Sequence, residues 1–209
     1  MSEKQNPVIE KIVLAFDICY SSTIIEDLTL TGRFSKWQEF LIATRETVGK
    51  KNSPEDPDPY AFTGDGWLIM FPSQATGDTF FGYVNNLATD FHRRYELSIL
   101  PFLENPPEIS GITFGADVGR LLTIDFFGKT EYVGRPINIA CRLMNAIKDK
   151  VQDPGYKVLL SRPLFNHLSK TISQPELQFH FIEETRSLKN VRNGEAYRCI
   201  LADVNPTGE

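Results

Sequence analysis

An Asp-Gly pair between two β-prone runs is the feature that most constrains the fold of this chain. The segment Tyr60–Phe71 reads YAFTGDGWLIMF, with Gly64, Asp65 and Gly66 between the two runs. Asp-Gly in this setting is a strong signal for a β-hairpin, because both residues suit a tight turn between antiparallel strands. The sequence therefore predicts a sheet that contains adjacent antiparallel strands.

The rest of the chain alternates between strand and helix patterns. Ile9–Tyr20 is apolar on both faces, which is typical of a central strand. Further strands are predicted at Ile112–Val118, Leu121–Phe127, Lys157–Leu160, Leu177–Glu183 and Ala196–Leu201. Helices are predicted at Phe34–Val48, around Phe80–Phe91, at Pro136–Lys148 and at Pro163–Leu168, and the polar, proline-rich residues 49–59 are predicted to form a loop. Strands that occur both in hairpins and singly indicate an α+β fold, with helices packed on a mostly antiparallel sheet.

Composition limits the classes of protein that this chain can represent. With 209 residues, 41% of them hydrophobic, we expect a single domain whose core spans about residues 8–203. The net charge of −5 and the absence of a Lys/Arg-rich run argue against nucleic-acid binding. Three scattered cysteines without a CxxC pair, and no apolar run of the ~20 residues that a membrane span needs, favour a cytoplasmic protein.

Two aspartates mark a candidate metal site. Asp17 lies at the end of the predicted central strand, and Asp65 lies at the tip of the hairpin. If the two elements are neighbours in one sheet, the carboxylates converge at one edge, where they suit Mg²⁺ or Mn²⁺. Each residue also has an ordinary explanation, Asp17 as a solvated strand end and Asp65 as a turn residue.

A second group of candidates lies on the predicted helix at Pro136–Lys148. Asn138 and Arg142 are four residues apart and therefore share a helix face. An amide and a guanidinium presented together suit a ribose or a phosphate that gains negative charge during reaction, although taken alone an ordinary polar helix face is the commoner explanation. No GxxxxGK[ST], HExxH or GxSxG motif occurs in the chain.

Together these segments resemble the catalytic domain of class III adenylyl and guanylyl cyclases, in the same order along nearly the whole chain. VLAFDI resembles the family's first metal strand, FTGDGWLIMF its metal hairpin, and EYVGRPINIACRL its substrate helix. SLKNVRNGEAYRCI resembles the closing hairpin, where a basic residue reaches the triphosphate. The resemblance implies a ferredoxin-like βαββαβ core with additional strands.

The resemblance also implies roles for these residues. Asp17, the carbonyl of Ile18 and Asp65 would hold two Mn²⁺ or Mg²⁺ ions, while Asn138 would orient the ribose and Arg142 would stabilise the transition state. Lys189 and Arg192 are both candidates for the triphosphate-binding cation. Two chains would pack head to tail as a homodimer with two shared sites, each closing a nucleoside triphosphate into a 3′,5′-cyclic monophosphate with release of pyrophosphate.

The positions that read the base depart from the adenylyl cyclase pattern. Ala61 occupies the position of the lysine that contacts adenine, Glu131 occupies its partner position, and Tyr60 lies next to the missing lysine. With its hairpin of the form FTGDGW, the chain is similar to the pyrimidine cyclases of bacterial Pycsar phage defence, whose product is read by a separate effector protein. We expect UTP as substrate and cyclic UMP as product. The alternatives are a cytidylate or adenylate cyclase, or a catalytically inactive domain that binds a nucleotide or a partner.

Overall fold

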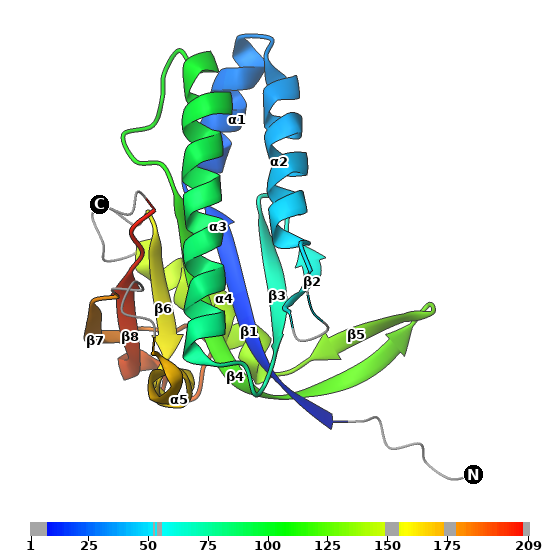
Figure 1. Ribbon diagram of the computed structural model, residues 1–209, viewed down its shortest axis with the longest axis vertical. Helices are drawn as coiled ribbons and strands as arrows, with labels where there is room; N and C mark the ends of the chain where they lie inside the picture. Colours follow the sequence, from blue (N-terminus) through cyan, green and yellow to red (C-terminus); the bar gives the residue numbers. More distant parts are fainter. Residues whose placement is uncertain (1–7, 52, 54–55, 149–154, 174–178, 207–209) are drawn as a thin grey trace.

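The computed structural model describes residues 8–51, 53, 56–148, 155–173 and 179–206 (Figure 1). The strands are β1 (Val8–Ile18), β2 (Asp58–Phe62), β3 (Gly66–Pro72), β4 (Ile112–Phe126), β5 (Lys129–Val133), β6 (Lys157–Ser161), β7 (Phe181–Arg186) and β8 (Tyr197–Asp203). The α-helices are α1 (Ser21–Leu30), α2 (Phe34–Val48), α3 (Gly77–Ser98), α4 (Arg135–Lys148) and α5 (Arg162–Leu168).

All eight strands belong to one sheet. Seven lie in the order β2-β3-β1-β4-β6-β8-β7, and β5 pairs with β4. Every pairing is antiparallel except that of β4 with β6, because α4 crosses from the end of β4–β5 back to the start of β6. The predicted α+β fold, with helices on a mostly antiparallel sheet, is confirmed.

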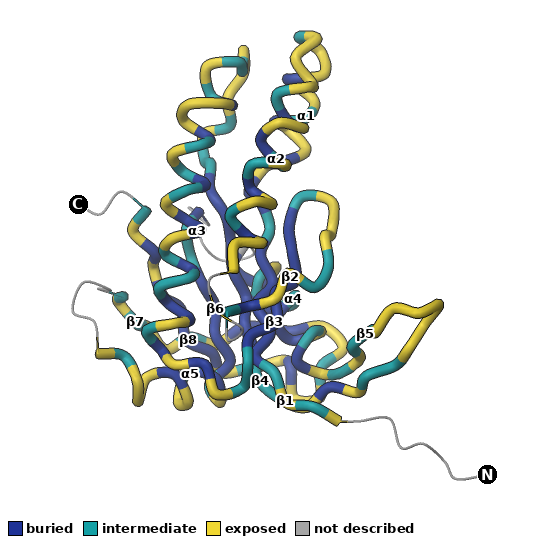
Figure 2. The backbone as a smooth tube through the Cα atoms, turned by 45° about the vertical axis from the view of Figure 1, so that its right-hand side comes forward, coloured by how far each residue is buried: buried dark blue, intermediate teal, exposed yellow. Residues whose placement is uncertain are grey.

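Helices cover both faces of the sheet, and this explains why β1 is apolar without interruption. Leu14 and Phe16 belong to the large core cluster that includes residues of α1, α2, α3 and α5. The alternate residues Val13 and Ala15 face the other way and pack with residues of α4. A strand that is buried on both faces needs apolar side chains at successive positions. Figure 2 shows β1 and β3 as largely buried stretches within these layers.

The predicted pair of strands at Ile112–Val118 and Leu121–Phe127 is wrong. The chain forms one strand, β4, that continues through Gly119, because its ladder with β1 runs without a break from Ile112 to Leu122. The end of β4 pairs with β5, which the sequence analysis did not predict, and the two form an arm that projects from the body (Figure 1). Phe126 and Phe127 are exposed at the tip of this arm.

The other predicted elements agree with the structure to different degrees. Helix α2 has the predicted bounds, Phe34–Val48, and the predicted hairpin is present as β2 and β3. The loop predicted at 49–59 ends earlier, because β2 begins at Asp58. Helix α1 was not predicted. The strand predicted at Leu177–Glu183 is β7 and begins at Phe181, while residues 177 and 178 lie outside the described residues.

Candidate functional site

Two neighbouring strands bring Asp17 and Asp65 to one end of the sheet. In the ladder between β1 and β3, Asp17 is the direct partner of Gly66, so Asp65 lies next to this pair. The turn that holds Asp65 closes with a hydrogen bond of 2.9 Å from the Thr63 N–H to the Gly66 carbonyl. A Cβ atom at Gly66 would lie 1.9 Å from the Phe16 carbonyl oxygen. Glycine at this position therefore allows the hairpin to lie close against β1.

Ser21 holds one of these two carboxylates in place. It is the first residue of α1 and follows Tyr20, whose φ of 55° turns the chain from β1 into the helix. The Ser21 hydroxyl donates a hydrogen bond to Oδ2 of Asp65. Ser21 is buried and Asp65 is half-buried, so this bond is partly protected from water and restricts the orientation of the carboxylate. Ser21 was not predicted, because α1 was not predicted, and the only signal for it in the sequence is a serine four residues beyond Asp17.

The donors at this end of the sheet fit a hard divalent cation. Two carboxylates, Asp17 and Asp65, lie beside the last residue of β1, Ile18, whose backbone carbonyl adds an oxygen. Among the described residues no group of three or more His, Cys, Asp or Glu side chains could hold a metal. A pair of carboxylates that leaves most positions to water and substrate phosphate suits Mg²⁺ or Mn²⁺ rather than a structural zinc ion.

Helix α4 lies unusually close to the sheet. A Cβ atom at Gly115 of β4 would be 2.1 Å from the carbonyl oxygen of Ala140 and 2.3 Å from the backbone nitrogen of Met144. Only glycine permits this approach. On the same helix Asn138 is exposed and Arg142, one turn further on, is half-buried. Their side chains are therefore available to a ligand on the α4 side of the sheet.

Within one chain Asn138 does not meet the aspartates. It lies between the helix residues that contact Gly115 and Gly119 of β4, and this part of β4 pairs with residues 11–15 of β1. The middle of that range is Val13, and Asp17 lies four residues further along β1. Asn138 is therefore about 13 Å from Asp17 along the strand direction. Asn138 is thus separated from the metal candidates, whereas Arg142 lies between the α4 residues that contact Gly115, whose partner on β1 is Ala15, two residues before Asp17.

The three candidates for base recognition come together on the strands beside α4. A bulge just before Ala61 leaves Tyr60 without a direct partner on β3, and bulges commonly redirect a side chain. The Tyr60 hydroxyl donates a hydrogen bond to Oε2 of Glu131 and accepts one of 2.9 Å from the Tyr132 N–H. Tyr60 and Ala61 pack in the same apolar cluster as Tyr132. Each of the three residues was predicted separately, and in the structure Tyr60 and Glu131 are hydrogen-bonded to each other.

Lys129 completes this group and was not predicted. Its Nζ lies 2.9 Å from Oε1 of Glu131 and 5.8 Å from the centre of the Tyr60 ring. The hydrogen bonds from Tyr60 and Lys129 hold the pKa of Glu131 below its usual value of 4.5. Burial and the hydrogen bond to Glu131 raise the pKa of Tyr60. Glu131 is therefore a carboxylate at neutral pH and acts only as a hydrogen-bond acceptor.

Lys189 and Arg192 lie on the loop between β7 and β8. This loop is closed by hydrogen bonds from Leu188 N–H to the Gly194 carbonyl, 2.7 Å, and from Gly194 N–H to the Val191 carbonyl, 2.9 Å. Leu188 and Val191 pack in the cluster that contains the buried side of α4. Both cations are exposed. The loop, held in place by these contacts, therefore presents two positive charges, and both residues remain candidates for binding the triphosphate.

The two helix layers, the mixed sheet and the projecting arm together define the fold of adenylyl and guanylyl cyclase catalytic domains. A bacterial light-regulated adenylyl cyclase superposes with a TM-score of 0.65 at 16% identity, over 96% of this chain and 53% of that chain. The guanylyl cyclase Cya2 gives 0.61 at 14% identity, over 96% and 93%. The adenylyl cyclase CyaB from P. aeruginosa gives 0.63 at 14% identity, over 95% and 96%. No protein-family model and no curated protein matches the chain.

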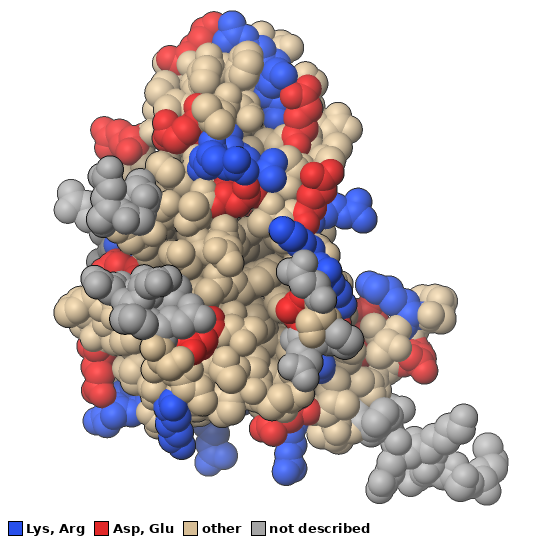
Figure 3. Space-filling view, in the orientation of Figure 1, with Lys and Arg blue, Asp and Glu red and all other residues tan. Residues whose placement is uncertain are grey.

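This chain spans about half the length of the light-regulated cyclase that it resembles. In the described ranges, none of the helices is long and apolar enough to cross a membrane. Acidic and basic side chains are interspersed on the face shown in Figure 3, and that face carries no extended surface of positive charge.

Proposed function

We propose that this protein is a nucleotidyl cyclase that converts a nucleoside triphosphate into its 3′,5′-cyclic monophosphate and pyrophosphate. The observation that carries the proposal is the pairing of Asp17 with Gly66, which places Asp17 and Asp65 side by side within a cyclase fold. In a different fold, two neighbouring carboxylates would be weaker evidence, because strand ends and turns often carry aspartate.

Asp17, Asp65 and the Ile18 carbonyl would hold two Mn²⁺ or Mg²⁺ ions. When bound, such ions lower the pKa of the attacking 3′-hydroxyl and offset the charge of the triphosphate. Ser21 keeps Asp65 in one orientation through its hydrogen bond. Residues that orient a metal ligand in this way commonly contribute about 10- to 100-fold to metal affinity or activity.

Asn138 and Arg142 would act on the sugar and the reacting phosphate. Asn138 would orient the ribose, and the Arg142 guanidinium would stabilise the negative charge that grows on the α-phosphate during the in-line attack. Lys189 or Arg192 would bind the β- and γ-phosphates. Because Asn138 and Asp17 are separated by about 13 Å along the sheet, a complete site needs a second chain. We therefore propose a homodimer with two shared sites.

The arrangement around Glu131 supports UTP as the substrate. With its two oxygens oriented by Tyr60 and Lys129, Glu131 can accept a hydrogen bond but cannot donate one. Uracil has a donor at N3, whereas cytosine has an acceptor there and carries its donor on the N4 amino group, so a carboxylate that faces N3 favours uracil over cytosine. Ala61 offers no donor to the N1 of adenine. The cyclic UMP would then act as a second messenger in phage defence, read by a separate effector protein, as the sequence resemblance implies.

An assay of all four ribonucleoside triphosphates tests this function. The purified protein is incubated with each nucleotide and Mn²⁺, and the cyclic products are identified by mass. We expect cyclic UMP as the main product. Dominant cyclic AMP or cyclic CMP would refute the choice of base, and the absence of any cyclic product would refute the enzyme. The variant Asp65→Asn should lose more of the rate than the roughly 10- to 100-fold that loss of a residue orienting a metal ligand costs, whereas the control Asp203→Asn, whose carboxylate pairs with Lys157 on the sheet, should keep the rate.

A further inference from the structure

A groove with apolar walls lies between α2 and the β2–β3 hairpin. Its volume is about 890 Å³, which is within the range of small-molecule sites. Helix α2 forms one wall, which includes Phe34, Ile42 and Arg45, and the hairpin forms the other, which includes Tyr60, Phe62 and Trp67. Figure 1 shows the lower end of α2 close to β2.

The walls combine exposed apolar side chains with one cation. Phe34, Ile42 and Phe62 are each about half exposed, which is unusual for large apolar residues grouped around one depression. Arg45 is the single charged residue in the lining and makes no ion pair with any part of the chain that the structure describes. From Phe34 to Arg45 the helix rises about 16 Å, so the groove can accommodate an extended chain with an anionic end at Arg45.

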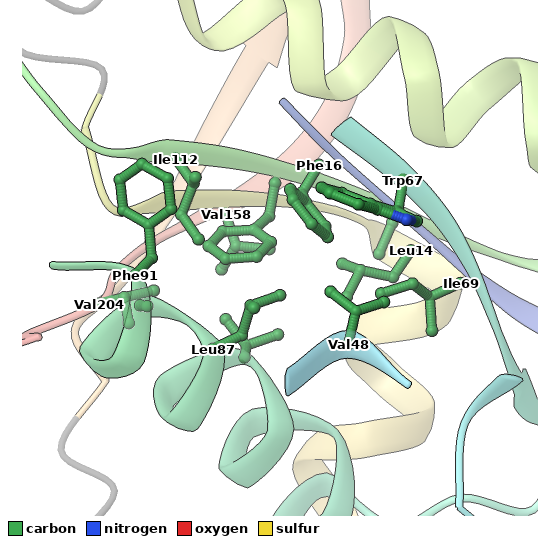
Figure 4. Packing of buried hydrophobic residues seen from close by; sticks show 14 of the residues in the cluster. Leu14, Phe16, Val48, Trp67, Ile69, Leu87, Phe91, Ile112, Val158 and Val204 are labelled. Atoms are coloured by element: carbon green, nitrogen blue, oxygen red, sulfur yellow. The ribbon is translucent and has the colours of Figure 1, made fainter. Parts of the chain in front are cut away.

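The hairpin wall of the groove contacts residues that support the metal candidates and the base-recognition candidates. The Trp67 ring stacks on Phe16 with centroids 5.3 Å apart and packs on Phe62 at 4.7 Å. Phe16 precedes Asp17, and Trp67 lies two residues after Asp65, so these rings support the strand ends that carry both carboxylates. Figure 4 shows Phe16 and Trp67 side by side in the core. On the same hairpin wall the groove reaches Tyr60, which donates a hydrogen bond to Glu131.

From these contacts we propose that the groove binds an amphipathic monoanion, an acyl chain with a carboxylate head, and that its occupancy regulates the reaction. The chain lies along the apolar walls and the carboxylate pairs with Arg45. A ligand against Trp67 and Tyr60 alters the packing behind the metal residues and the base-reading residues together. The regulatory half of this inference rests on the proposed cyclase activity, whereas the binding half does not.

The two tryptophans of the sequence, Trp37 and Trp67, both line this groove, so their emission reports on it alone. The probe is 11-bromoundecanoate, kept below its micelle concentration, because bromine quenches tryptophan at contact distance. We expect saturable quenching that is lost in Ile42→Asp. Leu97→Asp, which changes an exposed leucine on α3 outside the groove, should bind as the natural protein does. Arg45→Gln should weaken binding of the carboxylate probe about fivefold. The uncharged 11-bromoundecanol should bind the natural protein and Arg45→Gln equally, with the same weakened affinity.

Three results would overturn the binding half: no quenching by the monomeric probe, quenching that Ile42→Asp leaves unchanged, or equal affinity for the alcohol and the carboxylate. Tryptophan emission that shifts with protein concentration alone would instead assign the groove to a second copy of the chain. For the regulatory half, we expect the rate of cyclic product formation to change over the concentrations that quench tryptophan. If the probe binds an active enzyme and the rate stays constant, regulation is refuted, whereas binding in the groove is confirmed. If the protein has no cyclase activity, the quenching experiment still tests whether the groove binds the probe.

Discussion

At the scale of single residues, two aspartates that are buried among the described residues have opposite electrostatic surroundings. Asp117 on β4 is fully buried and lies 3.3 Å from Nη1 of Arg135. Burial raises the pKa of its carboxyl above the usual 3.8, more than its hydrogen bonds and Arg135 lower it. Asp27 on α1 accepts hydrogen bonds from the N–H groups of Glu104 and Asn105, and these bonds hold its pKa below 3.8.

These opposite shifts predict opposite dependences of stability on pH. As the pH rises above 3.8, the unfolded chain loses the proton of Asp117 while the folded chain still holds it, so the native state loses stability until its raised pKa is passed. For Asp27 the folded chain ionises first, so its contribution is present above 3.8 and is lost as the pH falls. Urea unfolding between about pH 3 and pH 7 measures both.

Relative to Asp117→Asn, the natural protein should become less stable with rising pH, and relative to Asp27→Asn it should become more stable. The two variants therefore act as controls for each other, since a general effect of pH on the fold would move both differences in the same direction. A difference between the natural protein and Asp117→Asn that stays constant with pH would contradict the assignment of Asp117.

How far single site residues can be predicted from sequence depends on the distance that their contacts span. The Asp-Gly turn is local, and it led directly to Asp65. The bond between Tyr60 and Glu131 joins residues 71 positions apart and depends on a bulge in β2. That from Ser21 to Asp65 spans 44 positions. Neither contact has a local signal, so their geometry becomes visible only when the sheet is assembled.

At the scale of elements, local and long-range signals again differ: the bounds of α2 were predicted, whereas the continuity of β4 was not. The bounds of α2 follow from apolar residues at helical spacing and from Gly49 at its end. The continuity of β4 depends on its pairing with β1 and β5, which no short window of sequence contains. Glycine in a strand often marks a break or a bulge, and at Gly119 it instead accommodates the nearby Pro136 ring, 3.1 Å from where a Cβ would lie.

The close approach of α4 to the sheet gives a prediction for this element. Gly115→Ala would place a Cβ 2.1 Å from the Ala140 carbonyl, so we expect a loss of about 1–3 kcal/mol from overpacking, measured by chemical denaturation. Gly82 inside α3 is the matched control, because a Cβ there meets nothing within 4 Å. Gly82→Ala should gain about 0.5–1 kcal/mol. Equal effects of the two substitutions would show that α4 can move away from the sheet without cost.

At the scale of the whole molecule, the distribution of the site residues determines what one chain can do alone. The metal candidates lie at the end of β1, and Asn138 lies about 13 Å away along the sheet. The arm of β4 and β5 extends from the body with Leu122, Phe126, Phe127 and Val133 exposed. A second chain would both cover such apolar residues and supply the missing half of each site.

Mixing two inactive variants tests whether the site is shared. Asp65→Ala removes a metal ligand and Arg142→Ala removes the guanidinium, so each variant alone should be inactive. In an equimolar mixture that exchanges subunits, half of the dimers contain one chain of each kind, and one of their two sites keeps all its residues. The mixture should therefore recover about one quarter of the natural rate. Native mass spectrometry establishes that mixed dimers form. Mixed dimers without activity would contradict the shared site, because Asp65 and Arg142 would then have to act together within one chain.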